Sequence, residues 1–280
     1  MKSPMTLRVG LIGRGIGQSR TPRMHVEEGR ANGLSYRYDL IDTTRNAVSL
    51  KTVLDHVESE GFRGVNITHP YKQAVLPFLD TLSNSAQAVG AVNTVIFEEG
   101  CRFGHNTDYW GFAEAFRQSL AGVLCCDVLL LGAGGAGGAV AHGLLDCGVE
   151  RLWIFDAKPQ AALRLADHIS QVRGEGRAQV TADPTLVLTR VQGIVNATPM
   201  GMASHPGSPL PTDALSTEHW VADIVYFPSE TAFLKAAGGR GCQVMNGSGM
   251  AVFQAVRAFE LFTGIEPDSD RMKATFDEFA

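Results

Sequence analysis

An amine and several hydrogen-bonding side chains follow a short apolar run in the segment GVNITHPYKQAVLPFLD, residues 64–80. Asn66 offers a carboxamide, Thr68 a hydroxyl and Lys72 a primary amine, around the point where a strand should end and a helix begin. Hydroxyls and carboxamides both donate and accept hydrogen bonds, and an ammonium group stabilises an oxygen that gains negative charge. This combination suits recognition of a small polyhydroxylated molecule beside a proton-transferring amine.

Similar polar groups follow other predicted strands. Ligands of open α/β sheets bind near the carboxyl ends of the strands, so these groups are candidates for the same site. Each also has a purely structural interpretation as a helix cap, a loop hydrogen-bonding group or a solvated side chain. The candidates are Ser19 and Thr21 in GQSRTP, Asn93 in GAVNTV, and Asn106, Thr107 and Asp108 in GHNTDYWGF.

A glycine-rich turn is the clearest single motif. It follows the apolar run CDVLLLG (126–132) and opens a helical pattern, which is the context that a dinucleotide-binding G-x-G-x-x-G requires. The glycines permit the turn, the approach of a pyrophosphate and close packing of helix on strand, and the free amides of a helix start favour an anion. The residues assigned to this turn are Gly132, Ala133, Gly134, Gly135, Ala136 and Gly137.

The next predicted strand, RLWIFD (151–156), ends in Asp156. A carboxylate there accepts hydrogen bonds from the adenosine ribose hydroxyls and repels a 2′-phosphate. NAD is therefore the expected cofactor in preference to NADP, although Lys158 nearby could partly offset the charge.

Short apolar runs alternating with helical patterns must position these groups, which indicates an α/β protein. The first half reads as β-α-β-α-β with parallel pairing, through strands at 7–13, 36–42 and 62–68 and helices at 49–61 and about 71–82. A second, more regular series begins at 126–132. It continues with helices near 137–147 and 159–171 and strands at 151–156, 193–198 and 220–225. The tail MAVFQAVRAFELFTG carries an apolar stripe typical of a packed helix.

Composition excludes several classes of function. The chain has 280 residues, enough for two domains, with 45% hydrophobic and 19% charged residues. A net charge of −5 without a basic run argues against nucleic-acid and anionic-membrane partners. No apolar stretch approaches the roughly 18 residues of a membrane span, and MKSPMTLRVG lacks the apolar core of a signal peptide. Five cysteines without a CxxC motif indicate reduced thiols in a cytoplasmic protein. His69, His105 and His142 show no metal-binding spacing, so no metal is expected.

Taken together, the motifs resemble the shikimate/quinate dehydrogenase family over nearly the whole chain. The matching segments occur in the family's order: SRTP (19–22), NITHPYK (66–72), GAVNT (90–94), NTD (106–108), GAGGAG (132–137), NATPMGM (196–202), DIVYFPSET (223–231) and GSGMAVFQ (247–254).

The resemblance implies an N-terminal α/β substrate domain and a C-terminal Rossmann-type dinucleotide-binding domain. The expected boundaries are 1–107, with a C-terminal helix of about 250–280 packing back on it, and 108–249. Lys72 and Asp108 match the family's catalytic pair. Ser19 and Thr21 match the hydroxyls that hold the substrate carboxylate, and Asn66, Thr68, Asn93 and Gln254 match the ring-hydroxyl contacts. Thr198, Met200, Met202, Val225 and Gly247 complete the cofactor site.

The implied activity is reversible NAD(P)-dependent oxidation of shikimate to 3-dehydroshikimate, of quinate to 3-dehydroquinate, or of both, as in the shikimate pathway of aromatic amino acid biosynthesis. Two departures from the family pattern matter. Biosynthetic members usually have a serine at the position of Thr21, and NADP-using members usually carry an Asn-Arg-Thr type segment where this chain has FDAKP (155–159). The first leaves the choice between shikimate and quinate open, and the second supports NAD.

Other interpretations remain open at this point. The chain could oxidise an aminoshikimate-type substrate of a secondary pathway, or belong to another class of two-domain dehydrogenase. A non-catalytic dinucleotide sensor would keep the fold without the chemistry. The sequence also leaves the oligomeric state open between monomer and homodimer.

Overall fold

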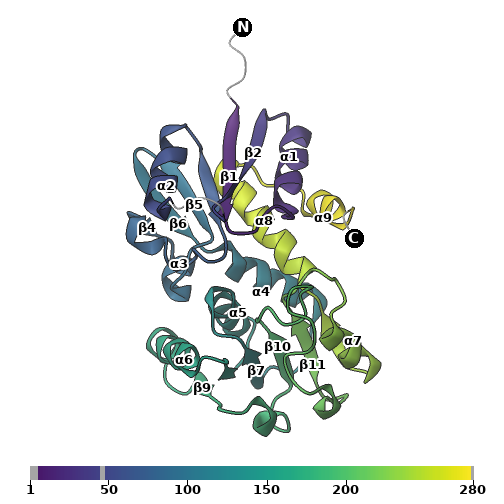
Figure 1. The fold of residues 1–280 in the computed structure, drawn as a ribbon. Helices are drawn as coiled ribbons and strands as arrows, with labels where there is room; N and C mark the ends of the chain where they lie inside the picture. The colour runs from purple at the N-terminus through teal and green to yellow at the C-terminus, as the bar shows by residue number, and fades with distance from the viewer. Residues whose placement is uncertain (1–5, 45–47, 279–280) are drawn as a thin grey trace. The chain divides into compact units, whose positions relative to one another are not determined.

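The computed structural model describes residues 6–44 and 48–278. Predictions for the first five and the last two residues therefore lie outside the described part. The chain folds into two compact units (Figure 1). Unit 1 extends to Thr107 and includes the chain from Val252 onward, and unit 2 is Asp108–Ala251. Each unit contains a six-stranded sheet with helices, which confirms the predicted two-domain α/β class.

Unit 1 is built on a mixed sheet of strand order β2-β1-β3-β5-β6-β4. β1, β2 and β3 pair in parallel, as predicted, but β5 pairs antiparallel with both β3 and β6. The parallel prediction for the whole first half is therefore wrong. Between β5 and β6 the reason is local, because Glu99 (φ 51°) and Gly100 (φ 75°) form a two-residue hairpin turn that sends the chain straight back. The strands are β1 Leu7–Gly13, β2 Tyr36–Asp42, β3 Gly64–Ile67, β4 Thr81–Leu82, β5 Thr94–Glu98 and β6 Cys101–His105.

Helices cover both faces of this sheet. Val9 and Leu11 of β1 face one cluster with Ala258 and Phe262, whereas Ile12 faces the other. This alternation follows from the two-residue period of a strand. The α-helices that lie wholly in unit 1 are α1 Thr21–Ala31, α2 Leu50–Ser59, α3 Asn84–Val89 and α9 Ser269–Asp277.

The helix predicted over residues 71–82 does not form. The Val75 N–H bonds to the Tyr71 carbonyl at 3.0 Å in a single turn, and only a short 3-10 segment, Leu76–Phe78, follows before β4. Pro77 lies in this segment and has no N–H, so it cannot occupy the interior of an α-helix. Lys72 therefore lies on a turn.

Unit 2 has a parallel sheet of strand order β12-β11-β10-β7-β8-β9. β7 occupies the middle, and all of Val128–Leu131 is buried, as expected for a strand covered on both faces. The predicted elements of this half are confirmed within two residues at most ends. The elements are β7 Asp127–Leu131, β8 Arg151–Phe155, β9 Ala178–Val180, β10 Gly193–Asn196, β11 Trp220–Asp223, β12 Gln243–Met245, α4 Thr107–Ser119, α5 Gly135–Asp146, α6 Pro159–Arg173 and α7 Ala232–Gly239.

The C-terminal segment forms two helices instead of the single helix predicted over about 250–280. α8, Ser248–Thr263, ends before Gly264 (φ 72°), and Pro267 precedes α9. From Val252 onward the chain belongs to unit 1. The predicted apolar stripe of α8 is buried, with Phe259 and Phe262 at 0% and 1% exposure.

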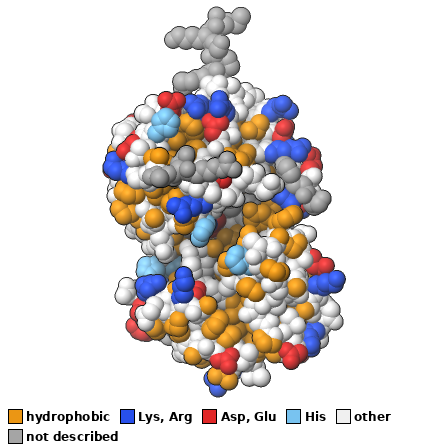
Figure 2. Space-filling view, in the orientation of Figure 1, with side chains coloured by type: hydrophobic (Ala, Val, Ile, Leu, Met, Phe, Trp, Pro, Cys, Tyr) orange, Lys and Arg blue, Asp and Glu red, His pale blue; other side chains and the backbone are white. Residues whose placement is uncertain are grey.

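The surface carries both signs of charge. On the face shown in Figure 2, Lys and Arg side chains are interspersed with Asp and Glu on each unit. Among the described residues, no helix combines the length and the apolar character needed to cross a membrane.

Candidate active site

The loop that follows β1 carries Ser19 and leads into α1, whose first residue is Thr21. The end of β2 holds this loop in place. The Asp42 carboxylate accepts hydrogen bonds from the backbone N–H groups of Gly15 and Ile16, both at 3.2 Å. Hydrogen bonds from Thr44 lower the pKa of Asp42 to about 2, so the anchor is ionised at neutral pH. The N-cap residue of α1 is Arg20, which makes no side-chain cap bond, but the Ser19 hydroxyl accepts from the Thr21 N–H at 3.4 Å. The structural interpretation as a group at the helix start therefore remains open for Ser19.

Asn66 lies inside unit 1 with its carboxamide fully engaged. Its Oδ1 accepts from the Tyr38 hydroxyl at 2.8 Å, and its Nδ2 donates to Thr94 Oγ1 at 2.9 Å and to the Asn93 carbonyl at 3.3 Å. Both amide hydrogens thus have protein partners. The side chain is 4% exposed, and this arrangement favours a positioning role for Asn66 over donation to a ligand.

Asn93 uses its carboxamide differently. Its Oδ1 accepts from the Thr107 backbone N–H at 2.7 Å and from the Thr94 hydroxyl at 3.1 Å. Its Nδ2 donates to Thr107 Oγ1 at 2.9 Å, which leaves the second amide hydrogen without a partner among the described residues. Asn93 therefore keeps one donor for a ligand and also fixes the start of α4.

Lys72 and Thr68 lie on the turn that leaves β3. The Thr68 N–H bonds to the Ile12 carbonyl at 3.0 Å, and the Lys72 carbonyl accepts from the Val92 N–H at 2.8 Å. A Cβ on Gly13 would lie 2.3 Å from the Thr68 methyl group, so the close approach of β1 to this turn requires glycine. The backbone of Lys72 is therefore tied to the residue immediately before Asn93.

Asp108 lies in the first turn of α4, next to Thr107. Negative charge is stabilised there by the unpaired amides of the helix start. Gln254 lies on α8 within the part of the chain that belongs to unit 1. The predicted substrate residues and Lys72 thus all belong to unit 1, and Asp108 is the first residue of unit 2.

The glycine-rich turn in unit 2 joins β7 to α5 as predicted. Gly132 has a φ of 100°, and a Cβ on Gly137 would lie 2.1 Å from the Gly132 carbonyl oxygen. Both positions therefore require glycine. A Cβ on Gly134, by contrast, would meet no described atom within 4 Å, so the space over the turn is open to a ligand. The other residues predicted here are Ala133, Gly135 and Ala136, at the turn and the first residues of α5.

Asp156 follows β8 and contacts this turn directly. Its Oδ2 accepts from the Ala133 N–H and its Oδ1 from the Lys158 N–H, both at 2.8 Å. Each carboxylate oxygen has further lone pairs, so the group can also accept from ribose hydroxyls.

The remaining predicted cofactor residues lie at the carboxyl ends of β10, β11 and β12. A Cβ on Gly132 would lie 2.8 Å from the Ala197 carbonyl oxygen, so the loop with Thr198 and Met200 packs against the glycine-rich turn. The Gly247 N–H bonds to the Val225 carbonyl at 3.3 Å. Met202 lies further along the loop and is 43% exposed.

Sequence reasoning missed the two buried side chains that hold these segments. Asn196 and Asp223 end β10 and β11, are fully buried and bond to each other at 2.9 Å. The signal in the sequence was a polar residue closing each apolar strand, in GIVN and WVAD.

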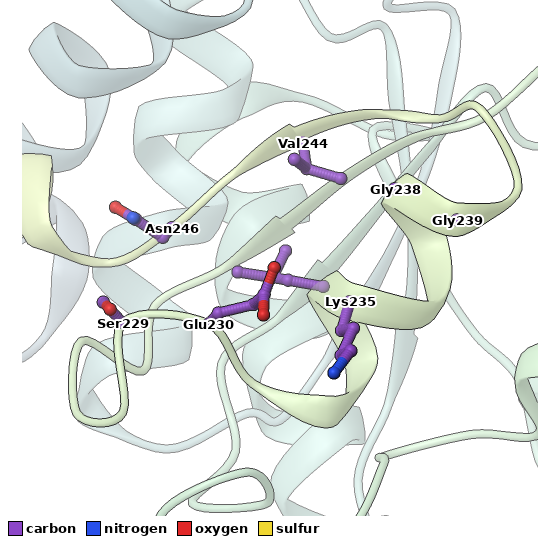
Figure 3. A pocket seen from close by; sticks show the side chains of 8 residues that line it. Ser229, Glu230, Lys235, Gly238, Gly239, Val244 and Asn246 are labelled. Atoms are coloured by element: carbon purple, nitrogen blue, oxygen red, sulfur yellow. The ribbon is translucent and has the colours of Figure 1, made fainter.

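A separate shallow pocket of about 270 Å³ lies beside α7 and β12 (Figure 3). Glu230, Lys235 and Asn246 are among its lining residues, and none of the predicted site residues lines it. Among the described residues, no group of three or more His, Cys, Asp or Glu side chains could hold a metal ion.

The chain has two α/β units, and unit 2 carries a glycine-rich turn beside a strand that is followed by Asp156. These features are typical of a two-domain dehydrogenase that uses a nicotinamide dinucleotide. Residues 11–95 match the family model "Shikimate dehydrogenase substrate binding domain", and residues 247–275 match "Shikimate 5'-dehydrogenase C-terminal domain". The chain belongs to the shikimate dehydrogenase family and is an oxidoreductase.

This chain is similar to known relatives and to solved structures over nearly its whole length. It is 50% identical to a shikimate dehydrogenase (NADP(+)) of Streptomyces avermitilis, over 97% of this chain and 95% of the relative. It is 48% identical to a quinate/shikimate dehydrogenase (NAD(+)) of Corynebacterium efficiens, over 97% and 98%. The structure of a quinate dehydrogenase from Corynebacterium glutamicum in complex with NAD superimposes with a TM-score of 0.93, 46% identity and coverage of 98% and 99%.

Proposed function

We propose that this chain catalyses the reversible oxidation of a ring secondary alcohol of shikimate, quinate or both, with NAD preferred to NADP. The observation that carries the proposal is the shared anchoring of the two predicted catalytic segments. The Lys72 carbonyl is bonded to Val92, and Thr107, which precedes Asp108, is bonded to Asn93. Two neighbouring residues thus fix both segments, as acid–base chemistry at a single oxygen requires.

A bound nicotinamide ring supplies the hydride acceptor. The reacting hydroxyl must lose its proton as the hydride leaves, and its oxygen gains alkoxide character. Lys72 stabilises this charge in its cationic form, and in its neutral form it accepts the proton. Asp108 orients the amine and the hydroxyl. Asn93 contributes its remaining amide hydrogen to a ring hydroxyl, and the Ser19 and Thr21 hydroxyls hold the substrate carboxylate.

The preference for NAD rests on Asp156. Its carboxylate is bonded to the glycine-rich turn, and its charge repels a 2′-phosphate at the ribose. The exposed Lys158 is the basic side chain in the same short turn, and its backbone N–H is bonded to Asp156. Relatives of both cofactor classes occur at similar identity, so the local charge is what supports this choice.

The test is steady-state kinetics with shikimate and quinate, each with NAD and with NADP, followed by absorbance at the nicotinamide band. We expect turnover of one or both acids, with a higher kcat/KM for NAD. Turnover of neither acid by a protein that binds NAD would contradict the proposal and favour a dinucleotide sensor. An amino-substituted shikimate belongs in the same panel, because exclusive use of it would identify a secondary-pathway enzyme.

We also propose a cytoplasmic location. All five cysteines are free thiols in the structure, which fits a reducing compartment. Fractionation of the source cells tests this, and recovery of the activity outside the cytoplasmic fraction would contradict it.

A further inference from the structure

Asp223 is a fully buried carboxylate at the end of β11 that accepts three hydrogen bonds. Its Oδ1 accepts from Asn196 Nδ2 at 2.9 Å and from the Val225 N–H at 3.0 Å. Its Oδ2 accepts from the Thr231 hydroxyl at 2.8 Å. The backbone N–H of Val225 can only donate, so Oδ1 acts as an acceptor and the Asn196 group in contact with it must present a hydrogen.

This requirement determines the orientation of the Asn196 carboxamide. Nδ2 must face Asp223, and it also donates to the Met200 carbonyl at 2.9 Å. Oδ1 consequently faces Thr198, where it accepts from the backbone N–H at 3.0 Å and from the hydroxyl at 2.7 Å. Because the Thr198 hydroxyl donates to Asn196, its oxygen is left to accept from the Met200 N–H at 3.1 Å.

The hydrogen bonds therefore form a chain with one direction of donation. Met200 donates to Thr198, Thr198 donates to Asn196, and Asn196 donates to Asp223. Rotation of the Asn196 carboxamide by 180° would place its oxygen against the carboxylate and its NH₂ against two donors. The orientation of the Asn196 carboxamide, and with it the bonds to Thr198 and Met200, thus depends on a carboxyl group that is not part of the loop.

Asp223 also holds the second predicted cofactor segment. It accepts from the Val225 N–H, and Val225 in turn accepts from the Gly247 N–H. A Cβ on Gly247 would lie 2.2 Å from the Ile224 carbonyl oxygen, so the two segments are in close contact. On the other side, the Thr198 loop packs against Gly132.

We propose that Asp223 is the positioning residue for the nicotinamide half of the dinucleotide site. It orders the loop with Thr198 and Met200 and the segment with Val225 and Gly247, and it acts through Asn196 without touching the ligand. This inference rests on the proposed function and on the family resemblance, in which the loop with Thr198 and Met200 forms the nicotinamide side of the cofactor site and Val225 and Gly247 also belong to that site. The glycine-rich turn and Asp156 form the adenosine half, and among the described residues Asp223 makes no hydrogen bond to either of them.

The test compares the affinities of NAD and of ADP-ribose, which lacks the nicotinamide ring, by isothermal titration calorimetry of the full chain. In Asp223→Ala, the Asn196 and Val225 donors lose their acceptor and the carboxamide is free to rotate. We expect the ratio of the NAD Kd to the ADP-ribose Kd to rise about tenfold or more, with the ADP-ribose Kd near that of the wild type.

Three variants complete the design. Asp223→Asn keeps an oxygen for Asn196 and Val225 and can turn its NH₂ toward the Thr231 oxygen, so it should restore the wild-type ratio. Thr231→Val is the matched control. It removes the bond to Oδ2 and the side-chain cap on the Leu234 N–H, so it should lower Tm without changing the ratio. Asn196→Ala removes the carboxamide that connects Asp223 to Thr198. It should raise the ratio of the NAD Kd to the ADP-ribose Kd, and it provides this test even if Asp223→Ala fails to fold.

Equal weakening of NAD and ADP-ribose binding in Asp223→Ala and Asn196→Ala would overturn the inference. So would a shift of the ratio in Thr231→Val as large as that in Asn196→Ala. The Kd values of NAD and of ADP-ribose are both binding constants, so they can be measured whether or not the enzyme turns over a substrate. A wild type that binds NAD and oxidises neither acid would end the proposed function and still report on Asp223.

Discussion

Asn66 and Asn93 are chemically identical side chains with different capacity left for a ligand. Asn66 donates both of its amide hydrogens, to Thr94 Oγ1 and to the Asn93 carbonyl. Asn93 donates one of its two amide hydrogens, to Thr107 Oγ1. The sequence assigned both to ring-hydroxyl contacts, since residue type alone does not show how many hydrogen bonds the fold already uses. The structure supports Asn93 as the contact and Asn66 as the group that positions it.

Lys72→Ala should lower kcat by at least about a hundredfold, because it removes the group that handles the hydroxyl proton. The Kd for NAD should be nearly unchanged. Lys51→Ala is the control, since Lys51 is an exposed lysine of α2 paired with Asp55, and it should keep wild-type kcat. Steady-state kinetics and calorimetry check both, and a Lys72→Ala enzyme with near-full kcat would exclude this role.

Asp156→Asn should raise the kcat/KM for NADP relative to NAD by about tenfold, because the charge that repels the 2′-phosphate is gone. The carboxamide oxygen can still accept from the Ala133 N–H, but its NH₂ cannot accept from the Lys158 N–H, so Tm should fall slightly. Asp156→Ala removes both acceptors and should lower Tm further. Kinetics with both dinucleotides check this, and an unchanged NADP to NAD ratio would remove the argument for NAD.

At the scale of elements, two glycines of one turn have different reasons to be glycine. A methyl group on Gly137 would collide with the Gly132 carbonyl oxygen, whereas one on Gly134 would meet only open space. Gly134 also has a φ of −79°, which other residues adopt easily.

Gly137→Ala should therefore destabilise the protein by about 1–3 kcal/mol and also weaken NAD binding, because the turn itself must shift. Gly134→Ala should keep the wild-type Tm and weaken NAD binding, because its methyl group fills the space where a pyrophosphate would approach the backbone. Thermal denaturation and calorimetry separate the two effects. Wild-type NAD affinity in Gly134→Ala would place the pyrophosphate elsewhere.

At the scale of the whole molecule, α1 and α9 lie far apart in the sequence and are joined in unit 1. The buried carboxylate of Glu28 on α1 accepts from Arg271 Nε at 2.6 Å and from the Asp268 N–H at 3.0 Å, which joins α1 to the start of α9. His25 of α1 is fully buried among the rings of Tyr38, Phe259 and Phe262. Its burial lowers its pKa to about 3 from the ordinary 6.5.

This shift predicts a loss of stability in acid. Below about pH 6.5 the unfolded chain binds a proton at His25 while the folded chain does not, so the free energy of unfolding falls until about pH 3. His25→Phe removes this contribution and should show a smaller fall between pH 7 and pH 5. Urea unfolding at both pH values measures it, with exposed His56→Gln as the control. An equal fall in wild type and His25→Phe would contradict the prediction.

The sequence predicted the parallel βαβ unit of the dinucleotide domain well, because its strands are apolar runs and its helices have regular spacing, both of which are local patterns. It predicted the first domain less well. Pro77 ended a helical pattern, and a hairpin turn at Glu99 and Gly100 reversed the chain between β5 and β6. β5 therefore runs against both of its neighbours, β3 and β6.

The sequence by itself determined the class of fold, the glycine-rich turn with its acidic partner Asp156, and the residue types available for alcohol oxidation. These depend on neighbouring residues and short spacings. Only the tertiary structure decided which polar groups are already satisfied and which anions hold the loops. Asp223 and Asn196 meet because the parallel strands β10 and β11 end at the same edge of a sheet. Asn93 and Thr107 meet because β5 begins where the antiparallel β6 ends, and neither proximity leaves a local pattern in the chain.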